Sequence, residues 1–204
     1  MNKVEEYNPN VGIVILAAGA STRMGTPKQL LRYQERTLLR HTIEVAIASV
    51  CRPIVVVLGA NAQLIRSDIS QLSIQIVENL QWNKGMSSSI EVGIQELKTF
   101  SPELDAVIVT LCDQPFISTE IINQLALAYH STNKPIIACE YGKTLGVPAL
   151  FSDRLFSELM TLIGGEGAKQ IIKKHSQEVF SISFPEGATD IDTPKEYADL
   201  LIMT

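Results

Sequence analysis

Apolar positions along the chain form two kinds of run, short continuous runs and longer runs with helical spacing, and the two kinds alternate. Residues 11–17 (VGIVILA) are apolar and rich in β-branched side chains, as in a strand buried on both faces of a parallel sheet. In residues 38–50, apolar side chains recur at three- and four-residue intervals. The pattern therefore predicts a strand followed by a helix.

The same alternation continues as far as residue 129. The predicted strands are residues 53–58, 74–77 and 106–111, and the predicted helices are residues 61–69, 88–97 and 119–129. Serial strand–helix units imply a parallel sheet covered by helices on both faces. We therefore expect an α/β, Rossmann-like three-layer sandwich with a mostly parallel sheet. We expect residues 1–204 to form one domain, with residues 1–10 as a flexible polar tail.

The pattern is less regular after Pro135. Residues 135–140 and 179–184 are predicted strands, and residues 152–162, 167–175 and 193–202 are predicted helices. Between them, residues 141–151 (YGKTLGVPALF) are rich in turn residues and then apolar. We expect this half of the chain to carry the more variable loops.

Composition and charge narrow the class of protein. With 204 residues, of which 46% are hydrophobic and 19% charged, the chain resembles an ordinary globular protein. Its net charge of -5 disfavours non-specific binding to nucleic acid or to anionic membranes. No run approaches the ~18 apolar residues of a membrane span, and the acidic first ten residues do not resemble a targeting leader. We expect a soluble, cytoplasmic protein.

The three cysteines predict neither a disulfide framework nor a zinc site. Cys51, Cys112 and Cys139 are widely spaced, and none belongs to a CxxC pair. The chain also shows no Cys/His or Ser/His constellation, so we expect a reaction that needs no protein nucleophile.

The turn after the first predicted strand is the first candidate site. It reads LAAGASTRMGTPK over residues 16–28, at the edge of the sheet where ligands of open α/β folds gather. The turn is not a dinucleotide fingerprint, because the second glycine of GxGxxG is missing after Gly19. It is not a P-loop either, because no lysine follows Gly25 directly. Its small residues let an anion approach the backbone, and its two cations can contact phosphates. The alternative is a tight strand exit with two solvated cations. The candidate ligand-binding residues here are Leu16, Ala17, Ala18, Gly19, Arg23 and Lys28.

Asp113 is the second candidate, at the carboxyl end of the fourth predicted strand in TLCDQP. A carboxylate at this edge can hold Mg²⁺, which binds through one or two carboxylates together with substrate phosphates. Alternatively, Asp113 caps a turn before the helix that follows Ser118.

A second acidic site lies in DIDTPKE near the end of the chain. Thr193, Pro194 and Glu196 are explained as a capping box with proline at the first helical position. Asp190 and Asp192 lie two residues apart on an extended stretch, so their side chains point the same way. Both could face a metal ion, or both could lie in a solvated loop.

Residues 78–94 (ENLQWNKGMSSSIEVGI) bring three serines to a predicted helix start. Ser88 and Glu91 have the spacing of a capping box, which favours a structural role for Ser88. Ser89 and the backbone at Gly85 and Met86 are free to contact a ligand.

The string LAAGxSxRMGxxK resembles the signature of MobA-like nucleotidyltransferases, and specifically of molybdenum cofactor cytidylyltransferases. Guanylyl-transferring members usually show GG where this chain has Ala18 and Gly19. The resemblance implies a fold of the nucleotide-diphospho-sugar transferase type. It also implies that Mg²⁺, or Mn²⁺, is held by Asp113 and Asp192, with Asp190 the weaker candidate. It implies nucleotide contacts at Ser89 and Asn79.

The activity implied by this resemblance is transfer of CMP from CTP to the phosphate of molybdenum-bound molybdopterin, with release of pyrophosphate. The implied catalytic residues are Arg23, Lys28 and Asp113. Lys28 is expected on the α-phosphate and Arg23 on the leaving pyrophosphate. A molybdoenzyme would then receive the product.

Two later segments resemble the part of the family that meets the acceptor, GVPALF at residues 146–151 and GGEGAK at residues 164–169. The family usually shows GDxGAR in the second segment, where this chain has Gly165 and Lys169. A lysine cannot contact a phosphate bidentately as an arginine does. GGEGAK also fits a helix end followed by a new helix start.

Two alternative functions therefore remain open. The first is cytidylyl or guanylyl transfer to another phosphorylated acceptor, such as methylerythritol phosphate or a sugar phosphate. The second is a nucleotide-binding chaperone that delivers a cofactor without chemistry.

Overall fold

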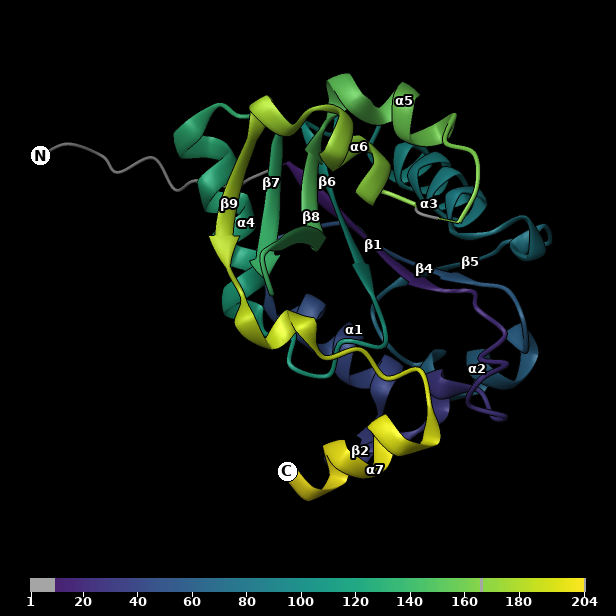
Figure 1. Ribbon diagram of the computed structural model, residues 1–204. Helices are drawn as coiled ribbons and strands as arrows, with labels where there is room; N and C mark the ends of the chain where they lie inside the picture. The colour runs from purple at the N-terminus through teal and green to yellow at the C-terminus, as the bar shows by residue number, and fades with distance from the viewer. Residues whose placement is uncertain (1–9, 166, 204) are drawn as a thin grey trace, which may run out of the picture.

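Strands from both halves of the chain form one seven-stranded sheet in the order β5-β4-β1-β6-β8-β7-β9 (Figure 1). The computed structural model describes residues 10–165 and 167–203, so nearly all of the predicted tail at residues 1–10 lies outside the described residues. Every strand except β8 runs in the same direction, which confirms the mostly parallel sheet. The strands are β1 Val11–Ala17, β4 Ile54–Leu58, β5 Gln75–Glu78, β6 Ala106–Leu111, β7 Ile136–Tyr141, β8 Thr144–Ser152 and β9 Val179–Ser183.

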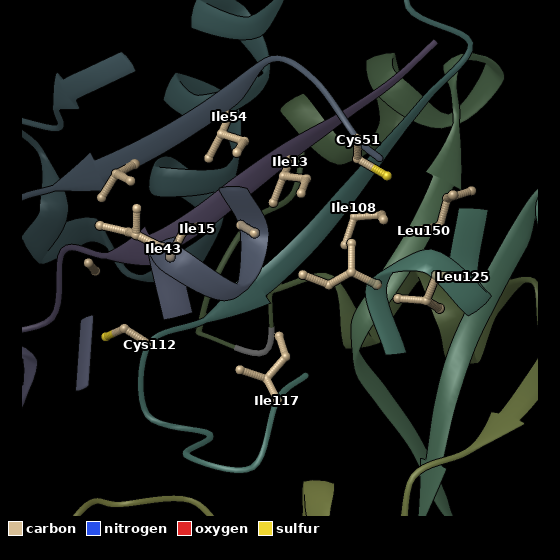
Figure 2. Close-up of a cluster of buried hydrophobic side chains, with 14 of the residues drawn as sticks. Ile13, Ile15, Ile43, Cys51, Ile54, Ile108, Cys112, Ile117, Leu125 and Leu150 are labelled. Carbon is tan, nitrogen blue, oxygen red and sulfur yellow. The ribbon is translucent and has the colours of Figure 1, made fainter. Parts of the chain in front are cut away.

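Helices cover both faces of this sheet, as the alternating pattern predicts. On one face lie α1 Leu38–Ala48, α2 Ala62–Ile69 and α4 Thr119–Thr132, and on the other lie α3 Met86–Phe100, α5 Phe156–Met160 and α6 Lys169–Lys174. Figure 2 shows the first layer, where Ile13 and Ile15 of β1 lie among side chains that include Ile43 and Leu125. Val14 packs into the other layer. Fully burying one such side chain stabilises the fold by roughly 1.5–3 kcal/mol.

Short elements and a final helix complete the described chain. The C-terminal helix packs through Leu200 onto a small separate cluster that includes Met24, Tyr33 and Ile191. No helix among the described residues is long and apolar enough to cross a membrane. The remaining elements are η1 Lys28–Leu30, β2 Arg32–Tyr33, β3 Arg36–Thr37, η2 Trp82–Lys84, η3 Asp153–Leu155, η4 Ser176–Glu178, η5 Pro185–Ala188 and α7 Pro194–Met203.

The structure corrects the sequence expectations in the second half. Most of the segment expected to be turn-rich, residues 141–151, forms β8, which pairs antiparallel with both β6 and β7. Gly142 and Lys143 form its two-residue hairpin turn, and both have positive φ, as a type I′ turn requires. The helix expected over residues 152–162 is reduced to η3 and the short α5.

The predicted capping box at Ser88 is wrong. Helix α3 begins at Met86, after Gly85 with φ +100°, so Ser88 lies inside the first helical turn. The Ser88 hydroxyl donates to the Gly85 carbonyl (2.8 Å) and does not cap an amide. Glycine accepts this positive φ without strain, which lets the helix start two residues earlier than the serine pattern suggests.

Candidate active site

Two chain segments far apart in sequence meet at the carboxyl end of β6. Asp113 lies just beyond that strand, and its carbonyl accepts a hydrogen bond from the amide of Ile191 (2.9 Å). Because Ile191 is fully buried, the residues on either side of it, Asp190 and Asp192, point away from the core. The backbone pairing therefore carries the carboxylates of the DIDTPKE segment to Asp113.

The capping box at the start of α7 holds Asp192 in place. Glu196 Oε2 accepts from the amides of Asp192 (2.9 Å) and Thr193 (2.8 Å), and the Thr193 hydroxyl accepts from the Glu196 amide (3.3 Å). This confirms the predicted Thr193–Glu196 box. The alternative for Asp113, capping a turn before α4, is wrong because its Oδ2 accepts from Lys28 and its Oδ1 has no hydrogen-bond partner among the described residues.

The two cations of the opening turn pair with these carboxylates. Lys28 Nζ donates to Asp113 Oδ2 and to Asp192 Oδ1 (2.9 Å), and Arg23 Nη2 donates to Asp192 Oδ2 (2.8 Å). The four side chains form one charge chain, which we call the Arg23–Asp113 charge chain. Sequence reasoning assigned the cations to phosphates and the carboxylates to a metal, and did not foresee that they contact one another.

The side chains of Lys28 and Arg23 differ in solvent exposure. The Lys28 side chain is 13% exposed, whereas that of Arg23 is 68% exposed. Burial alone would lower the pKa of Lys28, but the charge of Asp113 and the hydrogen bonds to Asp113 and Asp192 outweigh it and raise the pKa above its ordinary value. Lys28 is thus a buried positive charge inside the site, and Arg23 is an exposed one at its rim.

The aspartates also differ. Burial opposes ionisation of Asp192, but its hydrogen bonds and charge interactions with Lys28 and Arg23 lower its pKa. For Asp190, desolvation of the carboxyl by neighbouring protein atoms is the largest effect on the pKa, followed by repulsion from the negative charges of Asp113 and Asp192. Together they raise its pKa to about 6. The Asp190 residue is nonetheless solvent-exposed, so water screens part of this effect.

The carboxylates fit a divalent cation whose remaining ligands come from the substrate. Asp113 Oδ1 is buried and has no hydrogen-bond partner among the described residues. Within residues 10–165 and 167–203, no group of three or more histidine, cysteine, aspartate or glutamate side chains could hold a metal ion alone. Mg²⁺ commonly binds through one or two carboxylates and takes its other ligands from phosphates and water. Asp113 and Asp192 suit that role.

A cavity of about 410 Å³ opens beside the charge chain. It is lined by most of the predicted binding residues, and also by Gln29, Trp82, Asn83 and Cys112, which sequence reasoning did not select. A smaller hollow of about 130 Å³ adjoins it at Arg23 and Asp192. The predicted residues that line the larger cavity are Leu16, Ala17, Ala18, Gly19, Lys28, Ser89 and Asp113.

Asn79 lies behind this cavity and does not line it. Its side chain is buried, and its Nδ2 donates to the hydroxyls of Ser88 (2.9 Å) and Ser89 (3.0 Å). Its Oδ1 accepts from the Gln81 amide (2.8 Å). In this structure Asn79 supports Ser89 from behind the cavity wall, and its predicted contact with the nucleotide stays a prediction.

The cysteine beside Asp113 has a raised pKa. Burial, and then the charge of Asp113, raises the pKa of the Cys112 thiol to about 12, so it stays protonated at neutral pH. All three cysteines are free and buried. None of the three therefore forms a disulfide.

Residues 13–179 match the MobA-like NTP transferase domain family. The chain belongs to this family. It is 30% identical over 207 residues to the nicotine blue oxidoreductase of Paenarthrobacter nicotinovorans, covering 95% of this chain and 97% of that protein. It is 23% identical over 188 residues to the molybdenum cofactor cytidylyltransferase of Escherichia coli (strain K12), covering 92% and 93%.

A solved structure agrees in fold. The chain superposes on Rv0371C of Mycobacterium tuberculosis H37Rv, solved in complex with manganese, with a TM-score of 0.78 and 26% identity, covering 95% of this chain and 99% of that one. The protein is therefore a nucleotidyltransferase with the three-layer sandwich of its structural neighbours.

In this MobA-like nucleotidyltransferase, the acceptor-like segment closes one side of the cavity. Gly165 lines the cavity, and the Gly164 carbonyl accepts from the Ser87 hydroxyl at the start of α3 (2.7 Å). Lys169 begins α6 and is exposed. Both readings of GGEGAK are therefore compatible with the structure, because the segment joins α5 to α6 and also reaches the cavity.

Proposed function

We propose that this enzyme transfers CMP from CTP to the phosphate of a molybdopterin-type acceptor, with Mg²⁺ or Mn²⁺ as cofactor, and releases pyrophosphate. We also propose that it acts in the cytoplasm and that a molybdoenzyme receives the product. The observation that carries the proposal is the Arg23–Asp113 charge chain at the mouth of a cavity that Ser89 lines.

The reaction forms a bond between an acceptor phosphate oxygen and the α-phosphorus of CTP, and breaks the bond from that phosphorus to the oxygen that bridges the α- and β-phosphates, which leaves with pyrophosphate. In this proposal Lys28 contacts the α-phosphate and stabilises the negative charge that develops there, and its burial beside Asp113 supports this role. Arg23, at the exposed rim, can follow the departing pyrophosphate and hold it with a planar two-donor fork. A divalent ion on Asp113 and Asp192 would neutralise phosphate charge.

The resemblance at Ala18 supports CTP as the nucleotide. Ala18 lies in the wall of the cavity, at a position where the resemblance assigns glycine to guanylyl-transferring members. Ser89, held by Asn79, offers a hydroxyl to the polar edge of a pyrimidine.

The decisive experiment incubates the protein with Mg²⁺, molybdenum-loaded molybdopterin and each of the four nucleoside triphosphates in turn, and measures pyrophosphate release. We expect release with CTP well above that with the other nucleotides. Preference for GTP or ATP would contradict the assignment of CTP. Nucleotide binding without turnover would favour the delivery chaperone.

A second candidate keeps CTP and changes the acceptor. Gly165 and Lys169 depart from the acceptor pattern of the family that the chain resembles, which leaves room for methylerythritol phosphate or a sugar phosphate. Running the same assay with these acceptors separates the two candidates. Faster release with either of them than with molybdopterin would select this second function.

A further inference from the structure

Gln29 follows Lys28 directly, and its side chain is almost completely buried, with 1% of the residue exposed. Glutamine is mostly an exposed residue in folded proteins. A buried amide persists where its donors and acceptor find partners, so the partners of Gln29 indicate what it does.

All of those partners lie in the turn that precedes Lys28. Gln29 Nε2 donates to the carbonyls of Ala17 (2.9 Å) and Gly19 (2.9 Å). Gln29 Oε1 accepts from the Ser21 hydroxyl (3.3 Å), and that hydroxyl in turn accepts from the Lys28 amide (3.0 Å). The side chain therefore links the start, the middle and the end of the turn.

These bonds fix the direction of the peptide groups. In a trans peptide, the C=O and the following N–H point in opposite directions. With the carbonyls of Ala17 and Gly19 held against Gln29, the N–H groups of Ala18 and Ala20 are directed away from it. The Ala18 carbonyl accepts from the Ala60 amide (3.0 Å), so all three carbonyls of the small-residue turn are engaged within the protein.

We propose that Gln29 is a positioning residue that keeps the carbonyls of this turn turned away from a bound polyphosphate and leaves its N–H groups to face the anion. Successive backbone N–H groups form a concave site for anions, and an inward carbonyl would repel a phosphate. Gln29 acts through the backbone and through Lys28, and does not touch the reacting atoms. The inference rests on the proposed function only in taking a polyphosphate as the ligand.

Isothermal titration of inorganic tripolyphosphate with Mg²⁺ tests this without assuming which base the enzyme prefers. Gln29→Leu keeps the volume but removes all three hydrogen bonds, and Gln29→Glu keeps the shape but removes the donors. We expect both variants to bind tripolyphosphate at least about tenfold more weakly than the wild-type protein. Asn123→Asp on α4, which makes the same amide-to-acid change beside the Val50 amide, should bind like the wild type.

A purely structural role would lower the melting temperature and leave the affinity of the folded protein unchanged. Folded Gln29→Leu and Gln29→Glu proteins that bind within about twofold of the wild type would therefore overturn the proposal. If neither variant folds, Ser21→Ala, which loses one of the three contacts, should bind about two- to threefold more weakly. Wild-type affinity in Ser21→Ala would also overturn it.

The same titration separates this inference from the proposed function. If the wild-type protein binds no tripolyphosphate, both are wrong. If it binds and the Gln29 variants bind equally well, only the role of Gln29 is wrong. A third outcome is that the wild-type protein binds tripolyphosphate and the Gln29 variants lose affinity, but CTP is not a substrate. In that case only the proposed nucleotide is wrong.

Discussion

The two sides of the cavity are built in different ways. One side is formed by β1, β6 and the turn at residues 18–27. Almost all side chains of the two strands are buried, and Gln29 holds the turn by hydrogen bonds to the Ala17 and Gly19 carbonyls. The opposite side is lined by η2, by the start of α3 and by Gly165, which follows a loop residue, Ile163, that is 88% exposed. A rigid frame holds charged groups at fixed positions, whereas an exposed loop tolerates change. Substitutions on the first side should therefore affect every transfer reaction, and those on the second side should affect the choice of acceptor.

Asp113→Asn should give the largest effect, because it removes a buried charge from the rigid side and changes little in shape. We expect pyrophosphate release to fall by roughly 10²- to 10³-fold with every acceptor, while the fold is retained. Asp105→Asn is the matched control, since Asp105 precedes β6 at the opposite end of the same strand. Near wild-type Mg²⁺-dependent release of pyrophosphate by Asp113→Asn would show that Asp113 is not a catalytic residue.

Lys28→Met should separate metal binding from transfer. The ammonium lies between Asp113 and Asp192, so a divalent cation must compete with it for both carboxylates. Without Lys28, we expect Mn²⁺ to bind about tenfold more tightly in the absence of nucleotide, although transfer is lost. Titration followed by the electron paramagnetic resonance signal of free Mn²⁺ measures this affinity.

Arg23→Met supplies the comparison for that experiment. Arg23 also pairs with Asp192 but is largely exposed, so its removal should change Mn²⁺ affinity by less than that of Lys28. Equal Mn²⁺ affinities in the wild-type protein and Lys28→Met would show that Lys28 does not compete with the metal ion.

A double substitution on the acceptor side, Gly165→Asp with Lys169→Arg, should have a moderate and selective effect. A Cβ atom built on Gly165 meets nothing within 4 Å, and Lys169 is exposed, so both new side chains fit. The change installs the residues that the resembling family usually shows. We expect the KM for a phosphorylated acceptor to change about three- to tenfold while the KM for CTP stays the same. A parallel change in both KM values would mean that the two sides are coupled.

The difference between the two sides also explains how far the sequence could predict the structure. The strands of the first half are fully buried runs that alternate with amphipathic helices, so their type and order follow from local pattern. Strand β8 was not predicted because it lies between β6 and β7, and nothing local to residues 144–152 specifies that long-range pairing.

The candidate site divides in the same way. Lys28 and Asp113 stand next to predicted strand ends, and their position at the sheet edge could be inferred. Their mutual contact joins residues that are 85 positions apart, and Gln29 is buried because the turn before it folds over its side chain, so neither follows from a local pattern. The one local signal for Gln29 is its place directly before the apolar pair Leu30 and Leu31.

A histidine between two glutamates joins α5 to the end of α6, the two helices on either side of the loop that contains Gly165. His175 Nε2 contacts Glu158 Oε2 (2.9 Å), and His175 Nδ1 contacts Glu178 Oε2 (3.0 Å). Glu158 also accepts from Lys174 (2.7 Å). Hydrogen bonds to Glu158 and Glu178 raise the pKa of His175, and hydrogen bonds from Lys174 and His175 lower the pKa of Glu158 despite partial burial.

His175→Gln tests this cluster and should give the smallest effect. A raised folded-state pKa means that the contribution of His175 is complete below its unfolded value of ~6.5 and is lost as the pH rises through the folded value. The lowered pKa of Glu158 means that its contribution is present above ~4.3 and is lost as the pH falls through its folded value. We therefore expect the melting temperature of His175→Gln to fall furthest below that of the wild type near pH ~6, and the difference to shrink by about pH 8.5. Tripolyphosphate binding should be unchanged, because the cluster lies on the acceptor side. A melting-temperature difference that is constant across this range would show that His175 stabilises α5 and α6 by packing and not by charge.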